Sequence, residues 1–381
     1  MNSYQYQKTN RYFVQVADDI KDLAANELQE LGAGDIKAVY RGLYIDADKE
    51  SLYRINYQSR LINRVLAPLI TFKCHSDNYL YQTALKLPWD DFFSPDETFA
   101  VFASVSHSSI RHSKFAALRL KDAVVDYFKD KTKRRPSVDT HYPAIWLNLH
   151  IEQNEAVISI DTSGGSLHRR GYRKTSVQAP MIETLAAAII KYSEWDGTTP
   201  LYDPFCGSGT ILCEGWMFAT QTPPGILRDN FGFRLLPDYD DKLWQDVKKQ
   251  ADSKIKSIAK GLISGSDKNN KAVRATLANC QQIDPEKSIK VSREDVFSIG
   301  NLENKTIICN PPYGVRLNDK SNLSDFYKRL GDFLKQRCNG STAVIYFGER
   351  AYLKNIGLRS SWKKILSNGG LDGRLAKFEL Y

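Results

Sequence analysis

The run Asn310-Pro311-Pro312-Tyr313 is the part of the sequence whose residue types most clearly fit a chemical task. It follows the apolar stretch 306–309, and its two prolines stiffen the chain and remove two N–H donors. An exocyclic amino group of a nucleobase is a poor nucleophile, because its lone pair is delocalised into the ring. Acceptors at the Asn310 side chain and the Pro311 carbonyl could bind its two hydrogens and turn the lone pair toward a methyl donor, while Tyr313 stacks on the base. Such a loop would act mainly by proximity and orientation.

A second run, from Asp203 to Thr210, reads Asp-Pro-Phe-Cys-Gly-Ser-Gly-Thr and is expected to join a short strand to a helix. Two glycines let the backbone approach a ligand closely, and the helix start presents free N–H groups. The run lacks the Lys-Ser/Thr of a phosphate-binding P-loop, and Leu212 stands where a dinucleotide fingerprint would place its third glycine. Asp203 would repel a pyrophosphate but attract a sulfonium or an ammonium. The run therefore fits the methionyl end of S-adenosylmethionine (SAM), or a plain strand-to-helix turn.

A third candidate, Gly265-Ser266-Asp267, lies at the end of the next predicted strand. An acid at this place can accept both ribose hydroxyls of an adenosine. It can equally serve as a helix N-cap. Asp267 lies 58 residues after Gly209, beyond the usual interval of about 20 residues, so the first role requires an insertion between the two.

The elements that must position these residues alternate between strand and helix, which predicts a mostly parallel sheet with helices on both faces. A long insertion with prolines and aromatic residues is expected at 217–260, and a closing β-hairpin at 363–366 and 374–380. The predicted helices are 179–192, 270–279, 323–336 and one from 209, and the predicted strands are 200–202, 262–266, 289–292, 305–309 and 342–347.

The first half of the chain has a different pattern, that of a mixed α+β region. Strands are expected at 12–16, 98–105, 144–151 and 156–161, with further β structure at 37–45. Helices are expected at 18–31, 48–61 and 114–128. The Gly-, Ser- and Arg-rich composition that follows residue 162 indicates a linker before the second half.

The amino-acid composition limits the classes of function that the chain can have. The chain has 381 residues, 42% of them hydrophobic, and a net charge of +9, which suits a polyanionic partner such as nucleic acid or simply a well-solvated surface. Six Cys and six His do not fall at zinc-ligand spacing, so a metal site is not expected. The polar N-terminus and the short apolar stretches predict neither a signal peptide nor a membrane span, which makes a reducing cytoplasm the expected compartment.

The positive charge is concentrated between residues 106 and 135, where nine basic residues outnumber three acids. Phosphate contacts from such a cluster would give salt-dependent RNA binding, although about half of these side chains are expected to be ordinary solvated helix positions. The predicted RNA-binding residues are Arg111, Lys114, Lys131, Lys133, Arg134, Arg135, Arg169, Arg170 and Arg173.

These motifs also carry a family resemblance over nearly the whole chain. The runs that begin at Asp203 and Asn310 resemble motifs I and IV of class I SAM-dependent amino-methyltransferases. Residues 161–173, with 179–188, 120–128 and the C-terminal 369–381, resemble THUMP-containing RNA guanine-N2 methyltransferases, in particular the family that acts on bacterial 23S rRNA. The resemblance implies a ferredoxin-like unit at 1–64, a THUMP RNA-binding module at 65–165, a basic linker at 166–178 and a Rossmann-like methyltransferase domain at 179–381.

The resemblance further implies roles for single residues. The methionine end of SAM would contact Asp203, Gly207 and Gly209, the ribose Asp267, and the adenine amino group Asp295, with Glu294 as the alternative match. Glu183 would lie near the cofactor. The full implied sets are Asp203, Pro204, Cys206, Gly207, Gly209, Thr210, Glu183, Asp267 and Asp295 for the cofactor, and Asn310, Pro311, Pro312 and Tyr313 for the target base.

The expected activity is SAM-dependent methylation of guanine N2 in RNA, with rRNA as the first substrate and tRNA as the alternative. Adenine-N6 methylation of DNA or RNA is a second reading, because the Asn-Pro-Pro-Tyr chemistry suits any exocyclic amine, although the THUMP-like half argues against DNA. A non-catalytic RNA-binding assembly factor that keeps the SAM fold is a third.

Overall fold

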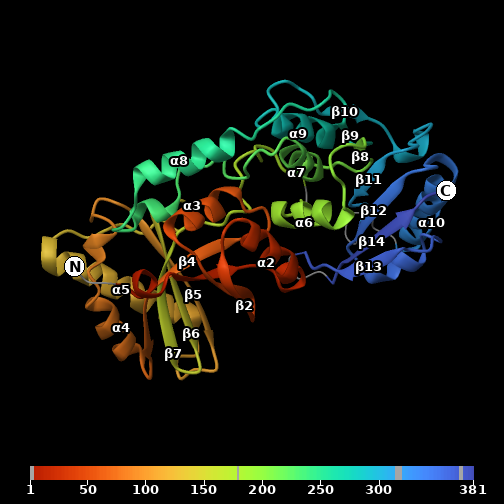
Figure 1. Cartoon of the computed structure of the whole chain (residues 1–381). Coiled ribbons are helices and arrows are strands. Elements are labelled where there is room, and N and C mark those ends of the chain that lie inside the picture. The colour runs from red at the N-terminus through yellow and green to blue at the C-terminus, as the bar shows by residue number, and fades with distance from the viewer. Residues whose placement is uncertain (1–3, 178–179, 314–319, 369–371) are drawn as a thin grey trace. The chain divides into compact units, whose positions relative to one another are not determined.

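The computed structural model of the chain describes residues 4–177, 180–313, 320–368 and 372–381. Contacts divide the chain into two units (Figure 1). The first comprises Met1–Leu167 and Arg228–Gln250, and the second comprises His168–Leu227 and Ala251–Tyr381. Each unit is built around one seven-stranded sheet.

The first unit begins with a β-α-β-β-α-β arrangement. Its strands are β1 (Arg11–Gln15), β2 (Gly34–Val39), β3 (Gly42–Asp46) and β4 (Arg64–Lys73), and its helices include α1 (Gln5–Thr9), α2 (Lys21–Glu30) and α3 (Lys49–Gln58). The strands lie in the order β2-β3-β1-β4, and all three pairings are antiparallel. This is the ferredoxin-like pattern expected from the sequence.

The same sheet continues past β4 into the region expected to form the THUMP module. The order is β4-β7-β6-β5, with β5 (Phe99–Ser106) parallel to β6 (Ile145–Glu152), and β7 (Glu155–Asp161) antiparallel to both β6 and β4. Helices α4 (Asp77–Leu85) and α5 (Ser113–Thr132) complete this region. The predicted boundary between residues 64 and 65 falls at the start of β4, a strand that pairs with β1 on one side and with β7 on the other.

The second piece of the first unit lies inside the range 179–381 that the sequence assigned to the methyltransferase domain. Residues 228–250 pack with the first unit, through the 3₁₀ turn η3 (Gly232–Leu235) and helix α8 (Asp241–Asp252). Their aromatic rings form a cluster with α3, because the Phe233 ring lies 4.6 Å from Tyr53 and the Trp244 ring lies 5.3 Å from Tyr57. A Cβ at Gly232 would lie 1.9 Å from the Asp161 carbonyl oxygen, so the chain can approach β7 this closely only at a glycine.

The second unit contains five parallel strands followed by an antiparallel pair, in the order β10-β9-β8-β11-β12-β14-β13. The strands are β8 (Leu201–Asp203), β9 (Ile263–Asp267), β10 (Lys290–Arg293), β11 (Thr306–Cys309), β12 (Thr342–Phe347), β13 (Trp362–Ile365) and β14 (Arg374–Glu379). The helices are α6 (Glu183–Ser193), α7 (Thr210–Ala219), α9 (Asn270–Cys280) and α10 (Lys320–Arg337). The order of strands reverses between β8 and β11, and ligands of such sheets bind beyond the carboxyl ends of the strands at that point.

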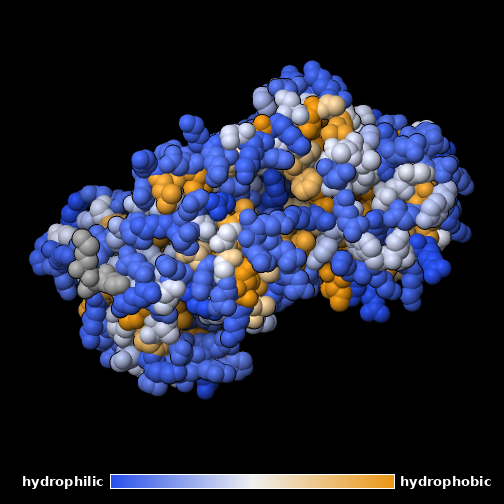
Figure 2. Space-filling model, in the orientation of Figure 1, coloured by the Kyte–Doolittle hydropathy of each residue, from blue (hydrophilic) through white to orange (hydrophobic). Residues whose placement is uncertain are grey.

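The side drawn in Figure 2 is mostly hydrophilic, with apolar residues in small groups. Within the described ranges, no helix is both long enough and apolar enough to span a bilayer.

Candidate cofactor and catalytic site

The loop between β8 and α7, residues 204–209, has the backbone of a ligand-binding turn and is called the glycine loop below. Gly207 and Gly209 both adopt positive φ, 57° and 81°, and Gly209 is the N-cap of α7. A Cβ at Gly209 would lie 2.7 Å from the Thr276 Cγ2 atom, so this position requires glycine for packing as well as for conformation. A Cβ at Gly207 would have no neighbour closer than 3.8 Å. Those neighbours, the Phe205 carbonyl oxygen and the Val177 Cγ2 atom, lie at an ordinary van der Waals distance, so glycine is favoured at 207 by the positive φ rather than by a lack of space.

Asp203 is a buried acid at the last position of β8. Its side chain is almost fully enclosed, and its carboxylate accepts a hydrogen bond from the Phe205 backbone N–H at 2.9 Å. Burial raises the pKa of Asp203 to about 8, and the nearby charge of Asp267 adds to the increase. A cation placed beside this carboxyl would favour its ionised form. The fit to a sulfonium or ammonium group is therefore good.

Asp267 lies beside the same loop. One carboxylate oxygen accepts from the Gly207 backbone N–H at 3.1 Å, and the other accepts from the Asn269 backbone N–H at 2.8 Å. The residue thus caps the turn before α9 and also contacts the glycine loop. The N-cap of α9 is Asn269, whose side chain accepts from the Lys271 backbone N–H at 2.9 Å, so the helix-cap role that the sequence left open for Asp267 is wrong. The ribose role of Asp267 remains a prediction.

The remaining predicted cofactor residues differ in their surroundings. Pro204, Cys206 and Thr210 are buried in the loop. Asp295 is the N-cap of the turn after β10, and its carboxylate accepts from the Phe297 N–H at 3.0 Å. The backbone N–H of its neighbour Glu294 donates to the Asp267 carbonyl at 3.2 Å, which joins the ends of β9 and β10.

Asn310 follows β11 directly, and β11 pairs with β8 in parallel register, Thr306 with Leu201 and Ile307 with Tyr202. Asn310 therefore lies at the same edge of the sheet as Asp203. Its side-chain oxygen Oδ1 is buried and has no hydrogen-bond partner among the residues that the structure describes. A buried acceptor without a donor costs free energy, so it is the strongest indication of a missing polar ligand at this edge.

The residues after Asn310 form a rigid turn. Pro311 is buried, and the Pro312 carbonyl accepts from the Tyr327 hydroxyl at 3.2 Å. The Tyr313 ring is only 8% exposed. It packs against Gly348, where a Cβ would come within 2.4 Å of the Tyr313 Cδ2 atom. The base-stacking role predicted for Tyr313 remains a prediction, and Gly314, the last residue of the motif, lies outside the described residues.

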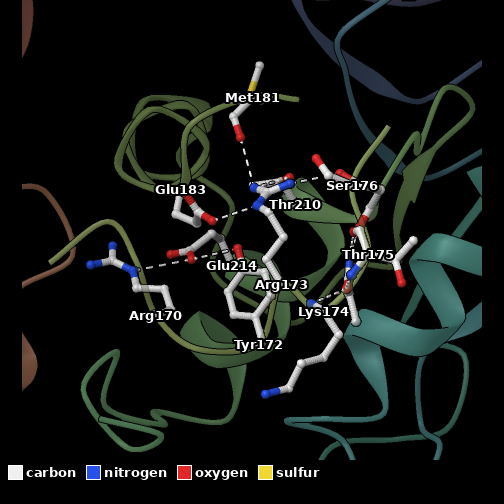
Figure 3. A network of polar contacts seen from close by, with 12 residues as sticks. Arg170, Tyr172, Arg173, Lys174, Thr175, Ser176, Met181, Glu183, Thr210 and Glu214 are labelled. Carbon is white, nitrogen blue, oxygen red and sulfur yellow. Dashed lines mark hydrogen bonds and ion pairs between the residues drawn. The ribbon is translucent and has the colours of Figure 1, made fainter. Parts of the chain in front are cut away.

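Two of the cations predicted to bind RNA are internal to the second unit. Arg170 is 2% exposed and forms an ion pair with Glu214 at 3.4 Å. Arg173 contacts the first residue of α6 and the start of α7 (Figure 3). A run of arginines in a Gly- and Ser-rich segment is typical of an exposed linker, but here acids on two helices bind them. Arg169 is exposed as expected.

Asn279 of α9 is a buried residue that sequence reasoning missed. Its side-chain oxygen accepts from the backbone N–H groups of Lys174 and Thr175 at 2.8 and 3.0 Å. Its amide nitrogen donates to the carbonyls of Thr175 and Ser208, both at 2.8 Å. Segment 170–177 is thereby fixed to the glycine loop. No local signal marks a single asparagine in the last turn of a helix for this role.

The predicted RNA-binding cations of the first unit are exposed, but they are not equally available. Lys131 binds the Asp90 carboxylate at 2.6 Å, and Arg134 forms a two-pronged ion pair with Asp96. At the other end of α5, Arg111 and Lys114 are exposed, and no ion pair involves either of them within the described ranges. Lys133 and Arg135 are exposed as well.

Three family models match the chain. They are described as an RlmL ferredoxin-like domain over residues 11–66, a THUMP domain over 74–161, and an RMKL-like methyltransferase domain over 170–377. The last spans more than half of the chain. Each match falls on a part of the sequence for which the corresponding resemblance was noted.

Whole-chain comparisons agree with these matches. A protein of Synechocystis sp. named as an RNA methyltransferase is 40% identical over 98% of this chain and 97% of its own length. The ribosomal RNA large subunit methyltransferase K/L of Syntrophotalea carbinolica is 35% identical over 97% of this chain, which spans about half of that relative, 53%. A crystal structure of a protein described as a methyltransferase, complexed with S-adenosylhomocysteine (SAH), aligns with a TM-score of 0.84 and 25% identity, covering 97% of this chain and 98% of that one.

Proposed function

This chain belongs to the family of RMKL-like methyltransferases, and from that premise we propose that it transfers the methyl group of SAM to the exocyclic N2 amine of a guanine in RNA, with 23S rRNA as the substrate. It is a SAM-dependent enzyme with a THUMP domain, ahead of a Rossmann-like methyltransferase domain. We assign RNA binding to residues 65–165. Catalysis is assigned to residues 179–381, apart from the segment 228–250 that packs in the first unit.

The observation that carries the proposal is the buried Oδ1 atom of Asn310, which has no hydrogen-bond partner among the residues that the structure describes. An exocyclic amine has two hydrogens to donate, and an amide oxygen at the end of β11 can accept one of them. The Pro311 carbonyl is the natural second acceptor, because the turn removes donors and leaves acceptors. With both hydrogens held, the nitrogen lone pair is directed away from the ring plane, toward the methyl donor.

The rest of the site binds the cofactor. SAM, when bound, supplies an electrophilic methyl group on a sulfonium. We propose that Asp203 faces the cationic groups at the methionine end of SAM. We also propose that the backbone of the glycine loop approaches SAM closely. Asp267 is assigned to the ribose hydroxyls and Asp295 to the adenine amino group. Glu183 is assigned to the surroundings of the methionine end.

The THUMP domain favours RNA over DNA as the substrate, whereas the choice of guanine N2 over adenine N6 rests on the family resemblance alone. The Asn-Pro-Pro-Tyr turn suits either amine. The two relatives described above are named as an RNA methyltransferase and as a large-subunit ribosomal RNA methyltransferase, and we extend that substrate to this chain. All six cysteines are free thiols in the structure, so we also propose the reducing cytoplasm as its compartment.

The experiment is a methyl-transfer assay with labelled SAM on purified rRNA and tRNA from cells that lack this protein, followed by mass spectrometry of the nucleosides. N2-methylguanosine in rRNA is the expected product. N2-methylguanosine in tRNA would overturn the substrate and keep the chemistry. N6-methyladenosine would overturn the base. SAM binding without any product in naked RNA or in assembling ribosomal particles would favour the non-catalytic assembly factor instead.

A further inference from the structure

Most of the hydrogen-bond donors of the Arg173 guanidinium are satisfied by residues at and around the glycine loop. The guanidinium donates four hydrogen bonds between 2.8 and 3.0 Å, and the side chain is 19% exposed. The four acceptors are the Glu183 carboxylate, the Ser208 hydroxyl, the Met181 carbonyl and the Thr210 hydroxyl. Figure 3 shows the guanidinium at the centre of this network.

One N–H of the Arg173 guanidinium remains without an acceptor among the described residues. A guanidinium has five N–H donors, one on Nε and two on each Nη. Nε donates to Glu183, and Nη2 donates to both Met181 and Thr210. Nη1 donates to Ser208, so its second N–H has no acceptor within the described parts of the chain. Because the side chain is partly exposed, this donor is within reach of a ligand.

The chemistry of the cofactor calls for such a donor. The methionine end of SAM carries an ammonium, a sulfonium and a carboxylate. The acids assigned to the site, Asp203 and Glu183, suit the two cations but would repel the carboxylate. Arg173 contacts both Ser208 and Thr210, which flank the Gly209 cap at the start of α7, and a helix start with a planar guanidinium beside it is a favourable place for a carboxylate.

We propose that Arg173 is a cofactor-binding residue that holds the methionine carboxylate of SAM through the second N–H of its Nη1 atom. Glu183, Met181 and the two hydroxyls hold the guanidinium in place. The inference depends on SAM as the cofactor, and it is independent of which base or which RNA is methylated. It also gives segment 170–177 a role, since the chain there is fixed to the glycine loop by Arg173 and by Asn279.

The test compares two ligands that differ at the carboxylate end. SAH carries the amino acid moiety, whereas 5′-methylthioadenosine lacks it. We expect Arg173→Ala to weaken SAH binding by about tenfold or more, the effect of losing a charge-assisted contact, and to leave methylthioadenosine within about twofold of wild type. Arg173→Lys should restore part of the SAH affinity. Arg169→Ala, an exposed arginine in the same segment, is the matched control and should bind both ligands as wild type does.

Equal losses for both ligands would overturn the proposal, because they would mean that Arg173 only shapes the loop. Unchanged SAH binding would overturn it as well. Since the alanine variant removes several internal hydrogen bonds, a second measurement uses the wild-type protein alone. Decarboxylated SAH should bind at least about tenfold more weakly than SAH, and equal affinity for the two would contradict the assignment.

Discussion

At the scale of single residues, the two ends of the proposed reaction depend on side chains in opposite electrostatic situations. Among the described residues, the Oδ1 atom of Asn310 is a buried acceptor without a donor, and Asp203 is a buried acid without a paired cation. Each is costly in the protein alone and becomes satisfied by a ligand of the right chemistry. The motifs Asn-Pro-Pro and Asp-Pro-Phe-Cys-Gly each carry residue types that suit such a ligand within a few positions, but neither motif predicts the burial, and the roles of both residues remain predictions.

The raised pKa of Asp203 predicts how stability depends on pH. In the unfolded chain this carboxyl loses its proton above a pKa near 3.8, whereas the folded, cofactor-free protein keeps it up to about pH 8. The unfolded state therefore binds fewer protons between those values, and the contribution of Asp203 to the free energy of unfolding falls as the pH rises through this window. Asp203→Asn cannot ionise, so it should lose less stability than wild type between pH 5 and pH 8.

Urea unfolding of both proteins at the two pH values, without cofactor, measures this difference. Parallel losses in wild type and variant would show that the folded protein does not hold the Asp203 proton. Addition of SAH to the wild type is a useful companion measurement, because its ammonium should promote ionisation of the same carboxyl and release protons below pH 8.

Single residues also show where sequence reasoning failed. Arg170 and Arg173 were predicted to bind RNA because arginines in a Gly- and Ser-rich segment are usually solvated. Their partners, Glu214 and Glu183, lie on α7 and α6, and only the folded unit brings them together. The assignment of Glu183 to the cofactor region rested on resemblance and remains a prediction.

At the scale of elements, helix α5 presents cations of two kinds. Lys131 and Arg134 near its C-terminal end are already paired with Asp90 and Asp96. Arg111 and Lys114 near its N-terminal end have exposed side chains, and Phe115 beside them is 46% exposed. These residues can therefore offer both a phosphate contact and an aromatic face to RNA.

We predict that the double charge reversal Arg111→Glu, Lys114→Glu weakens RNA binding more than the matched double reversal Lys131→Glu, Arg134→Glu. Equilibrium binding at several salt concentrations measures both affinity and salt slope, and the first variant should reduce the slope by about two. Equal effects would mean that the ion pairs with Asp90 and Asp96 open when RNA binds. SAH affinity should be unchanged in both variants.

The packing of α10 gives a second prediction at this scale. A Cβ at Gly331 would lie 1.8 Å from the Ile356 carbonyl oxygen, in the turn after the 3₁₀ segment η6 (Arg350–Lys354), so this helix can approach that turn only at a glycine. Gly331→Ala should lower the free energy of unfolding by about 1–3 kcal/mol, despite the better helix propensity of alanine. Gly300→Ala, where a Cβ would meet nothing within 4 Å, is the control and should change stability little. A stable Gly331→Ala protein would show that α10 can shift.

Most elements could be predicted from their periodicity, and the exceptions have physical causes. Strand β4 was not predicted because Pro68 interrupts the apolar run 64–73. In the structure, the register shifts between Pro68 and Ile70, a bulge at which a residue without an N–H donor is tolerated. The hairpin of β6 and β7 was predicted because two β-rich runs lie on either side of residues 152–155, and the closing pair of β13 and β14 was predicted as well.

At the scale of the whole molecule, each of the two units consists of two separate stretches of the chain. The sequence predicted an insertion at 217–260, but not that 228–250 belongs to the first unit. The prolines and aromatic residues of this stretch indicate an insertion. The hydrophobic core against which its aromatic rings pack depends on tertiary contacts, which no local sequence pattern encodes. Trp244 is buried in this segment beside Tyr53 and Tyr57 of the first unit.

Trp244→Ala should therefore destabilise the first unit by about 3 kcal/mol or more, although the residue lies between the glycine loop and Asp267 in the sequence. Thermal unfolding with and without SAH measures this, and SAH affinity at the second unit should stay within about twofold of wild type. A large loss of SAH affinity with little loss of stability would contradict the assignment of this segment to the first unit. Val291→Ala, a half-buried position in the second unit, gives a comparison for nonspecific effects.

The central claim is that Asn310 orients the amino group that receives the methyl. Single-turnover methylation of RNA by Asn310→Ala, with SAH affinity measured on the same preparation, tests it most directly. We predict a rate lower by on the order of 100-fold or more, with SAH affinity within a few-fold of wild type, because only the acceptor for the amine is lost. The exposed Asn301→Ala is the matched control and should react at the wild-type rate. A wild-type rate in Asn310→Ala would contradict the account of the catalytic loop.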